Sequence, residues 1–365
     1  MRILAIDIGG LTQDILLYDT TQTIENCVKM IMPSPTSVLA RKIRAATKNG
    51  HSIFFTGVNM GGGPSKRALN NHLKTGLRAY ATPSAAVTFD DDIKEVSKIG
   101  VTIINEDNLP NDTNIDTIVT RDLNLEAMEC ALTAFDVDPH FDAVAVAVLD
   151  HGVAPLGVSD RAFRFLHLQQ TLRKGHNLID FAYLAKEIPS HLTRMRAVAQ
   201  SMNRDMPLLV MDTPVVAAIG APMDRTVAQH PHRVIVNVGN FHTMAFHLRQ
   251  DSIMGLFEHH TRLLNTDQLD DLVIRLVRGE LTNEDIFNDN GHGCLIIESS
   301  PDVPFITVTG PQRHLMAGSK LDPYFAAPYG DMMLTGCFGL VSAFAQRTEK
   351  WHSEIEKALG ISQPS

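Results

Sequence analysis

The apolar residues of this chain fall into short runs that are bounded by glycine, proline or polar residues. The first run, residues 3–8, is nearly continuous, and a second run at residues 15–18 follows Gly9 and Gly10. A continuous apolar run is expected for a strand that is buried on both faces. Glycine adopts positive φ without a steric penalty from Cβ, so it suits a tight turn. The chain therefore begins with a predicted strand, turn and strand.

Further strands and helices are predicted along the rest of the chain. Apolar runs predict strands at residues 24–32, 52–57, 141–149, 207–210 and 304–308. Helical patterns are predicted at residues 36–48, 123–135, 161–204, 213–220, 263–278 and 330–344. Strands that alternate with helices in this way indicate an α/β fold.

The opening pattern of strand, glycine turn and strand is repeated at residues 233–248. Asn237 takes the position of Asp7 in this second copy, and Gly239 takes the position of Gly9. An internal repeat of a whole motif indicates a duplicated fold.

The composition is that of an ordinary globular protein. The 365 residues are enough for two domains, with 44% hydrophobic and 20% charged residues. The net charge of −9 argues against nucleic acid or an anionic membrane surface as the main partner. No apolar run approaches the ~20 residues of a membrane span, and the chain starts with a strand instead of a signal peptide. A cytoplasmic protein is expected.

The cysteines are far apart in the sequence and form no C-x-x-C pair. We therefore expect buried free thiols, and not a metal or iron–sulfur site built from cysteine alone, at Cys27, Cys130, Cys294 and Cys337.

Asp7 interrupts the apolar run of the first strand, close to the glycine turn. The exposed amides of Gly9 and Gly10 can hydrogen-bond phosphate oxygens, and a carboxylate beside them can hold Mg²⁺ directly or through water. This stretch predicts a metal–phosphate site.

Three other stretches carry candidate chemistry. Asp150 and His151 follow the strand at 141–149, where open α/β sheets bind ligands, so they are candidate substrate contacts. The alternative is a polar turn in which Asp150 caps the next segment. The glycine-rich residues 59–67 predict either an anion-binding helix start, with Lys66 and Arg67 as charge partners, or a flexible loop.

Asp212 follows the strand at 207–210 and precedes a helix with Pro214 in its first turn. Ala217, Ala218 and Gly220 would allow this helix to pack closely against a neighbour. The carboxylate is either a catalytic group or the N-cap of the helix.

The two glycine turns and the small-residue helices resemble those of the actin-like ATPase superfamily, which includes sugar kinases, heat-shock 70 chaperones and actin. The resemblance covers nearly the whole chain. It implies a duplicated ribonuclease H-like fold, with two domains around a hinge cleft. The first domain would span residues 1–230, with an inserted region at about 59–140, and the second would span residues 231–365.

The resemblance also implies ATP and Mg²⁺ as cofactors. Residues 7–14 and 237–243 are similar to the two phosphate motifs, and residues 307–317 are similar to the adenosine motif. Residues 212–220 and 330–344 are similar to the connecting helices that cross at the hinge. Asp7 would then hold Mg²⁺ and take part in catalysis, and the implied nucleotide contacts are Gly9, Gly10, Thr12, Gln13, Asn237, Gly239, Asn240, Thr309 and Gly310.

In sugar kinases of this superfamily, an Asp at the start of the first connecting helix acts as the base. Asp212 occupies this position and would accept a proton from a substrate hydroxyl or orient water. The second phosphate motif departs from the pattern, because it has Asn237 where many relatives carry Asp, and His242 where they carry a small hydroxyl residue. An amide can still bind a metal-bound water, but it adds no charge.

At closer range the chain resembles a family of archaea and anaerobic bacteria that is named for pyruvate formate-lyase activation. That name implies radical chemistry on an iron–sulfur cluster held by C-x-x-x-C-x-x-C. The sequence contains no such motif, so we reject this activity.

Three hypotheses follow. The first is an ATP-dependent phosphotransferase or ATPase that acts on an unidentified small molecule. The second is a non-catalytic, nucleotide-gated activator or assembly protein with a client protein as partner. The third is a metal-dependent hydrolase built on His259, His260 and His292.

Overall fold

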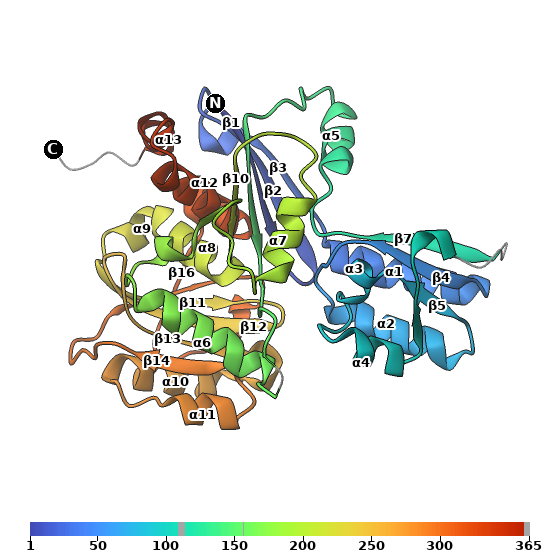
Figure 1. Cartoon of the computed structure of the whole chain (residues 1–365). Helices are drawn as coiled ribbons and strands as arrows, with labels where there is room; N and C mark the ends of the chain where they lie inside the picture. Colours follow the sequence, from blue (N-terminus) through green and yellow to red (C-terminus); the bar gives the residue numbers. More distant parts are fainter. Residues whose placement is uncertain (109–113, 156, 361–365) are drawn as a thin grey trace.

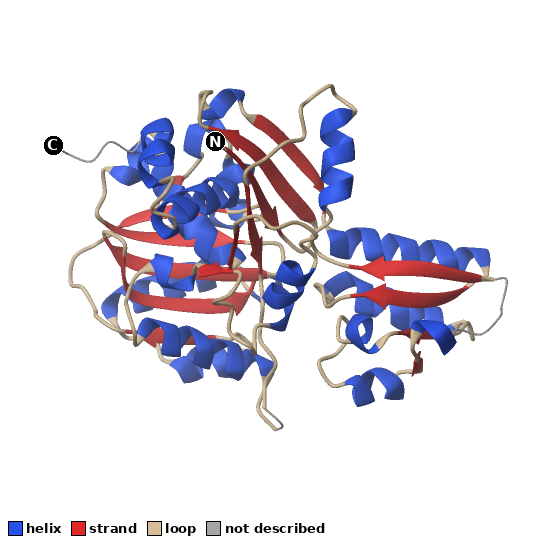
Figure 2. Cartoon of the chain, turned by 45° about the horizontal axis from the view of Figure 1, so that its top comes forward, coloured by secondary structure: helices blue, strands red, loops and turns tan. Residues whose placement is uncertain are grey.

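The computed structural model describes residues 1–108, 114–155 and 157–360. These residues form two six-stranded sheets and one four-stranded sheet, with helices on their faces (Figure 1). Figures 1 and 2 both show the four-stranded sheet and its helices as a lobe beside the two larger sheets. None of the described helices has the length and apolarity needed to cross a lipid bilayer.

The first six-stranded sheet is built on the opening hairpin. Its strands, in order across the sheet, are β3 (Val28–Pro33), β2 (Thr12–Asp19), β1 (Arg2–Ile8), β8 (Ala143–Val148), β10 (Leu208–Met211) and β9 (Tyr183–Leu184). β3, β2 and β1 are antiparallel, and β1, β8 and β10 are parallel. Every residue of β8 is buried, as its continuous apolar run predicts.

The second six-stranded sheet is built on the repeated hairpin. Its strands, in order, are β14 (Gly293–Ile296), β13 (Ser252–His260), β12 (His242–Arg249), β11 (His232–Val238), β15 (Phe305–Thr309) and β16 (Tyr324–Phe325). β13, β12 and β11 are antiparallel, and β11, β15 and β16 are parallel.

The two large sheets therefore share one topology. In each, three antiparallel strands with the first strand innermost are followed by two strands parallel to that first strand. This order is that of the ribonuclease H-like fold, and its duplication is the actin-like ATPase fold. The predicted fold class is confirmed by this strand order.

The four-stranded sheet lies between β3 and β8 in the sequence and is wholly parallel. Its strands, in order, are β6 (Val101–Ile103), β5 (Ala79–Ala81), β4 (Ser52–Gly57) and β7 (Ile115–Thr120). Its helices are α1 (Pro35–Asn49), α2 (Gly63–Lys74), α3 (Pro83–Ala86) and α4 (Ile93–Lys98).

This lobe has a hydrophobic core of its own, which includes Leu39, Ile43 and Phe55. The inserted region was expected at about 59–140, whereas the lobe draws its helices and strands from residues 35–120. α1 and β4 belong to it because their apolar side chains join its core. α5 (Leu125–Thr133) packs instead on the first large sheet, with Met128 in the core beside Leu4.

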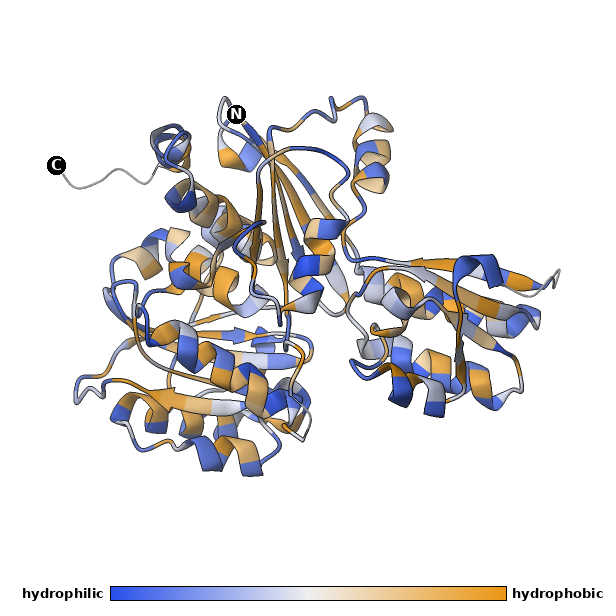
Figure 3. Cartoon of the chain, in the orientation of Figure 1, coloured by the Kyte–Doolittle hydropathy of each residue, from blue (hydrophilic) through white to orange (hydrophobic). Residues whose placement is uncertain are grey.

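Helices in the remaining chain cover the large sheets. They are α6 (Asp160–Leu172), α7 (Thr193–Gln200), α8 (Thr213–Gly220), α9 (Arg225–Ala228), α10 (Thr266–Arg278), α11 (Asn283–Asn288), α12 (Thr335–Arg347) and α13 (His352–Leu359). The mainly helical region predicted at 161–204 has helices at both ends, but β9 lies between them. Figure 3 shows both hydrophilic and hydrophobic residues on α10, whose buried residues include Leu269, Val273 and Leu276.

α8 and α12 cross between the two large sheets. Gly220 and Gly339 meet at the crossing, and a Cβ on Gly339 would lie 1.9 Å from the carbonyl oxygen of Val216. The same core contains Ile3 of the first sheet and Phe246 of the second sheet. The predicted crossing of the two small-residue helices is confirmed, and it joins the two halves.

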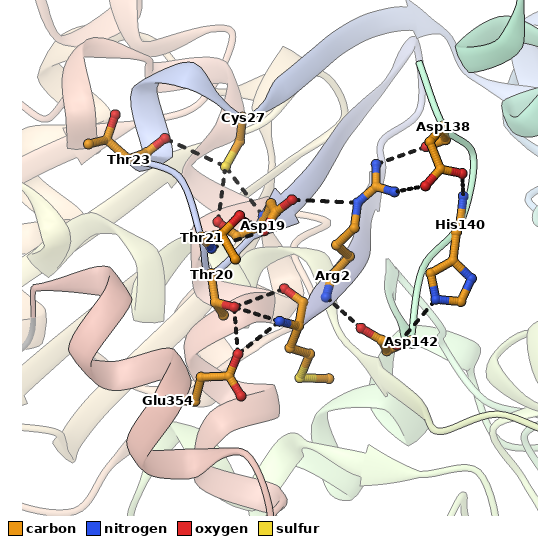
Figure 4. A network of polar contacts seen from close by, with 11 residues as sticks. Arg2, Asp19, Thr20, Thr21, Thr23, Cys27, Asp138, His140, Asp142 and Glu354 are labelled. Carbon is orange, nitrogen blue, oxygen red and sulfur yellow. Dashed lines mark hydrogen bonds and ion pairs between the residues drawn. The ribbon is translucent and has the colours of Figure 1, made fainter. Parts of the chain in front are cut away.

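Polar contacts also tie one end of the β1–β2 hairpin to neighbouring segments (Figure 4). Thr20 donates a hydrogen bond of 2.5 Å to Glu354 of α13. The backbone amide of Arg2 donates to Asp142, and its guanidinium donates to Asp138 at 3.0 Å. These contacts are exposed to solvent, so they orient the segments and add little stability.

Candidate functional site

A cavity of about 630 Å³ is enclosed jointly by the three sheets. The β1–β2 turn lines it from the first sheet, and the β11–β12 turn lines it from the second. The start of α2 lines it from the four-stranded lobe, through residues that include Gly62, Gly63 and Lys66. The glycine-rich stretch at 59–67 is thus a helix start at the cavity, while Arg67 is not among the lining residues. Anion binding there stays a prediction.

The two turns have the same internal hydrogen bond. Gly9 donates its amide proton to the carbonyl of Thr12 at 2.9 Å, and Gly239 donates to the carbonyl of His242 at 2.9 Å. Gly9, Gly10 and Thr12 all line the cavity. The structure therefore brings the two predicted phosphate motifs to one cavity in equivalent conformations.

Gln13 was also expected at the nucleotide, but it is not among the residues that line the cavity. Its side-chain amide donates to the carbonyl of Pro33 at 3.1 Å and so joins β2 to β3. Successive side chains of a strand point to opposite faces, and Gln13 is directed away from its neighbour Thr12.

The loop after β15 closes against the second turn. Asn237, Asn240, Thr309 and Gly310 all line the cavity. Gly310 has φ +97°, and a Cβ there would lie 2.7 Å from the side-chain oxygen of Asn237. Only glycine allows this approach without strain. Gln312 then donates to the side chain of Asn240 at 2.9 Å.

The two turns also touch each other. A Cβ on Gly10 would lie 2.0 Å from a ring carbon of Phe241, the residue between Asn240 and His242. The aromatic side chain of the second turn is therefore seated on the bare backbone of the first. This contact holds the two halves together at the cavity.

Asp7 and Asp14 are directly opposite each other in the β1–β2 pairing. Both are buried, and one carboxylate oxygen of each has no hydrogen-bond partner in the described part of the chain. Burial raises the pKa of Asp7 well above its usual range, and the nearby Asp14 carboxylate raises it further. Burial likewise raises the pKa of Asp14 to about 7. Two buried carboxylates with free oxygens have the chemistry of a divalent-cation site.

The first turn of α12 covers this pair. A Cβ on Gly336 would lie 2.0 Å from a carboxylate oxygen of Asp7, so glycine is required for α12 to approach this closely. Asp7 was predicted at this site from the sequence, but Asp14 was not. A two-residue turn at 9–10 would pair Asp7 with Thr12, whereas the observed register pairs Asp7 with Asp14.

Asp212 does not line the cavity, although Thr213 does. Both carboxylate oxygens of Asp212 accept hydrogen bonds from the guanidinium of Arg164, at 2.8 and 3.1 Å. Arg164 also donates to Glu258 at 2.6 Å, and all three side chains are buried. This geometry gives the base role of Asp212 no support, and that role stays a prediction.

The alternative role of Asp212 was an N-cap for the helix that follows. Asp212 does precede α8, but its side chain accepts no hydrogen bond from the described amides of the first turn. The carboxylate is committed to Arg164 of α6 instead. Neither of the two roles considered for Asp212 accounts for its contacts, which are those of a buried ion pair.

Asp150 has the contacts expected of a capping residue. One carboxylate oxygen accepts from the amide of Gly152 and the other from the amide of Met195 in the first turn of α7, both at 2.9 Å. Asp150 and the next residue, His151, both line the cavity. The end of the strand thus brings both predicted residues to the cavity, with the Asp150 carboxylate also bound to the two amides, and substrate contact there stays a prediction.

Three histidines that line the cavity lie close together. The ligand atoms of His151, His242 and His292 all lie within 4.8 Å of one another, and the Nε2 atoms of His151 and His292 are 3.1 Å apart. Burial lowers the pKa of His242 to about 3 and that of His292 to about 4, so both imidazoles are neutral. The predicted set of His259, His260 and His292 is wrong in part, because His260 and His292 line the cavity together but His259 does not.

His259 and His260 are neighbours in β13, so their side chains point to opposite faces of the sheet. His260 lines the cavity, with its ring centroid 4.9 Å from that of His292. His259 is directed elsewhere, with Nε2 3.2 Å from the carboxylate of Asp289.

A sequence profile of the family described as "Putative pyruvate format-lyase activating enzyme (DUF1786)" matches residues 60–315. The match covers well over half of the chain. The chain belongs to this family. No curated protein sequence matches it significantly.

The chemistry that the family description implies has no residues to support it in this member. An iron–sulfur cluster needs several thiolates close together. The four cysteines are free, and they lie before β3, in α5, in β14 and in α12.

Several solved structures are similar to the chain at low identity. The activator of 2-hydroxyisocaproyl-CoA dehydratase from Clostridium difficile, with bound ADPNP, has 8% identity over 100% of this chain and 99% of its own, with a TM-score of 0.32. The ethanolamine utilization protein EutJ from Carboxydothermus hydrogenoformans has 10% identity over 93% and 89%, with a TM-score of 0.31. Xylulose kinase from Lactobacillus acidophilus has 9% identity over 100% and 90%, with a TM-score of 0.27. The fold of this family member is assigned from its own strand order and not from these scores.

The residues that sequence reasoning missed in this family member are Asp14, Arg164 and Glu258. Arg164 was noted only as one of several arginines in a basic region. Its role depends on Asp212 and Glu258, which belong to other elements, and no local pattern marks such a contact.

Proposed function

We propose that this protein binds a nucleoside triphosphate, ATP being the first candidate, between the β1–β2 and β11–β12 turns. The observation that carries the proposal is the pair of equivalent glycine turns on one cavity, with the buried carboxylates of Asp7 and Asp14 beside the first turn. The amides of Gly9 and Gly239 donate within their own turns, so other backbone amides of the two turns would bind the phosphate oxygens. Two such turns can hold a polyphosphate from both sides.

The residues at the first turn fit Mg²⁺. Asp7 and Asp14 each have a buried oxygen without a partner among the described residues, and hard divalent cations prefer carboxylate oxygens. A bound Mg²⁺ would neutralise phosphate charge and supply electrostatic stabilisation for phosphoryl transfer. The chain's own contribution is to hold the two carboxylates opposite each other on β1 and β2.

Other residues that line the cavity would also contact the nucleotide. Asn237 and Asn240 present amide groups at the second turn, and Thr309 and Gly310 form the wall where the base and ribose would lie. Lys66, whose ammonium group is 3.0 Å from Asp90, would bring positive charge from the lobe toward the terminal phosphate. The lobe would thus close the site over the nucleotide.

The reaction class that we propose first is ATP hydrolysis or phosphoryl transfer to a small molecule. The second candidate is a nucleotide-gated activator or assembly protein that acts on a client protein. The position of Asp212 favours the second candidate, because its carboxylate is bound to Arg164 and does not line the cavity where a substrate would lie. Asn237 favours it also, since an amide adds no charge at the second turn.

Binding is tested by thermal denaturation and calorimetry with ATP, ADP and Mg²⁺. We expect ATP with Mg²⁺ to raise the unfolding temperature of the protein, and Asp7→Asn to lose the Mg²⁺-dependent part of this shift. Asp138→Asn, in the exposed contact of Figure 4, is the matched control and should behave as the wild type. No shift and no heat of binding for any nucleotide would overturn the proposal.

Turnover then separates the two candidates. Release of phosphate, or a phosphorylated product from a panel of small molecules, supports the enzyme. Tight ATP binding with no turnover supports the gated protein.

A further inference from the structure

We propose that His151, His242 and His292 form a second cation site, for a first-row divalent metal of the Zn²⁺ type, in the wall of the cavity. This site is separate from the carboxylates of Asp7 and Asp14. It does not depend on whether the cavity binds a nucleotide.

The three histidines come from three elements that the fold brings together. His151 follows the end of β8, His242 begins β12, and His292 directly precedes β14. Their ligand atoms all lie within 4.8 Å of one another. The pairing of β12 with β13, and of β13 with β14, sets His242 and His292 side by side.

The spacing of one nitrogen pair, that of His151 and His292, suits a tetrahedral ion. Zn–N bonds of about 2.0–2.1 Å place two ligand nitrogens roughly 3.3 Å apart. The Nε2 atoms of His151 and His292 are 3.1 Å apart. His242 completes the set, with its ring centroid 5.0 Å from that of His292 and 5.6 Å from that of His151.

Buried charges of both signs lie near the cluster. Glu258 is fully buried beside His242 and His292, and the Arg164 guanidinium also acts on these histidines. The only described hydrogen-bond donor to the Glu258 side chain is Arg164, through one oxygen, while the Glu258 carbonyl accepts from the amide of His292. The second oxygen of Glu258 has no partner within the described ranges. Arg164 also binds Asp212, so one guanidinium serves two carboxylates. A divalent cation on the imidazoles would offset this unbalanced buried negative charge.

The ligand set selects the class of metal. Neutral imidazole nitrogens suit Zn²⁺ and related borderline cations, whereas the carboxylates of Asp7 and Asp14 suit Mg²⁺. The cavity would therefore carry two cations of different chemistry. Since His151, His242 and His292 all line the cavity, the remaining coordination position opens into it. That position would take an oxygen ligand, either water or an oxygen atom of a small molecule.

The test uses the full chain after dialysis against a chelator. Zn²⁺ is titrated by competition with a chromophoric chelator, and Co²⁺ binding is followed by its visible absorption, which is intense for a tetrahedral site. We expect one equivalent of Zn²⁺ per chain and a rise in unfolding temperature on binding. Both His242→Ala and His292→Ala should weaken Zn²⁺ binding by roughly 100-fold or more.

The matched control is His247→Gln. His247 lies on the same strand as His242 and faces His232 at 2.8 Å, away from the cavity lining. This variant should keep the wild-type affinity and the Co²⁺ spectrum. Circular dichroism checks that each variant is folded. If an alanine variant is unfolded, His292→Gln is used in its place. The proposal is overturned if folded His242 and His292 variants bind Zn²⁺ as the wild type does, or if only His247→Gln abolishes binding.

Discussion

Gly220 of α8 and Gly339 of α12 lie backbone against backbone where the two halves of the protein meet. A Cβ on Gly220 would lie 1.9 Å from the carbonyl oxygen of Thr335, and a Cβ on Gly339 would lie 1.9 Å from that of Val216. The two helices cross this closely only because neither residue has a side chain. Domain closure in two-lobed proteins occurs at such packed helices.

Replacing Gly339 should therefore destabilise the protein strongly. Gly339→Ala places its methyl group against backbone, which cannot move aside as a flexible side chain can. We expect the free energy of unfolding to fall by about 3 kcal/mol or more, measured by chemical denaturation. Gly318→Ala is the control, because a Cβ there would meet nothing within 4 Å, and it should change the stability very little. Equal stabilities of the two variants would contradict the crossing geometry.

The contact between Gly10 and Phe241 predicts a coupled pair of substitutions. Gly10→Ala should displace the ring of Phe241, separate the two turns and lower the affinity for ATP by roughly tenfold. Phe241→Ala removes the obstacle, so the double variant should bind better than Gly10→Ala alone. Calorimetry of the four proteins measures the coupling. If the effects of the two substitutions on the free energy of ATP binding simply add, the turns do not meet through this contact.

Asp14→Asn should stabilise the protein in the absence of divalent cations. Asp14 faces Asp7, and their mutual repulsion raises the pKa of Asp7. Removal of one charge relieves that repulsion, so the unfolding temperature in EDTA should rise. The same variant should lose the stabilisation that Mg²⁺ gives to the wild type. A lower unfolding temperature in EDTA would show that the Asp14 charge is satisfied by contacts within the protein.

Asp212→Ala tests whether Asp212 is structural or catalytic. The substitution leaves Arg164 without one of its two buried partners, so the free energy of unfolding should fall by about 3–5 kcal/mol. Any ATP turnover per folded molecule should change less than tenfold, since the carboxylate is held by Arg164. An exposed pair provides the control: Glu129→Ala, which frees Arg204, should cost under about 1 kcal/mol. A loss of turnover above 100-fold with intact ATP binding would restore the base role.

His247 should contribute to acid sensitivity. Its burial lowers its pKa from 6.5 to about 4 in the folded protein, with His232 lowering it further. Between these values the unfolded chain binds a proton that the folded protein does not, so stability is lost as pH falls from 6.5 toward 4. His247→Gln removes about one proton from those bound on unfolding near pH 5. The slope of the free energy of unfolding against pH should therefore fall there by about 1.4 kcal/mol per pH unit. Denaturation at several pH values measures it, and an unchanged slope would contradict the prediction.

The sequence by itself determined the features that have a local cause. Continuous apolar runs marked β1 and β8, because a strand buried on both faces can carry few polar residues. Glycines marked the two turns, because a Cβ on Gly10 would meet the ring of Phe241 and a Cβ on Gly239 would lie 2.7 Å from the carbonyl oxygen of His242. Small residues at 217–220 and 336–343 marked the crossing helices, because close approach of backbones requires them. The repeat of these local signals was enough to predict a duplicated fold.

Only the tertiary structure decided which polar groups meet. Asp14 lies opposite Asp7 through strand pairing, and Arg164 reaches Asp212 and Glu258 from a different helix. His151, His242 and His292 converge from three separate elements, while His259 is excluded because it faces the other side of β13. The arginine and histidine contacts depend on how elements far apart in the sequence pack together, which no short-range pattern of residues encodes. The contact of Asp7 with Asp14 depends on the register of the first hairpin, which the two glycines do not fix.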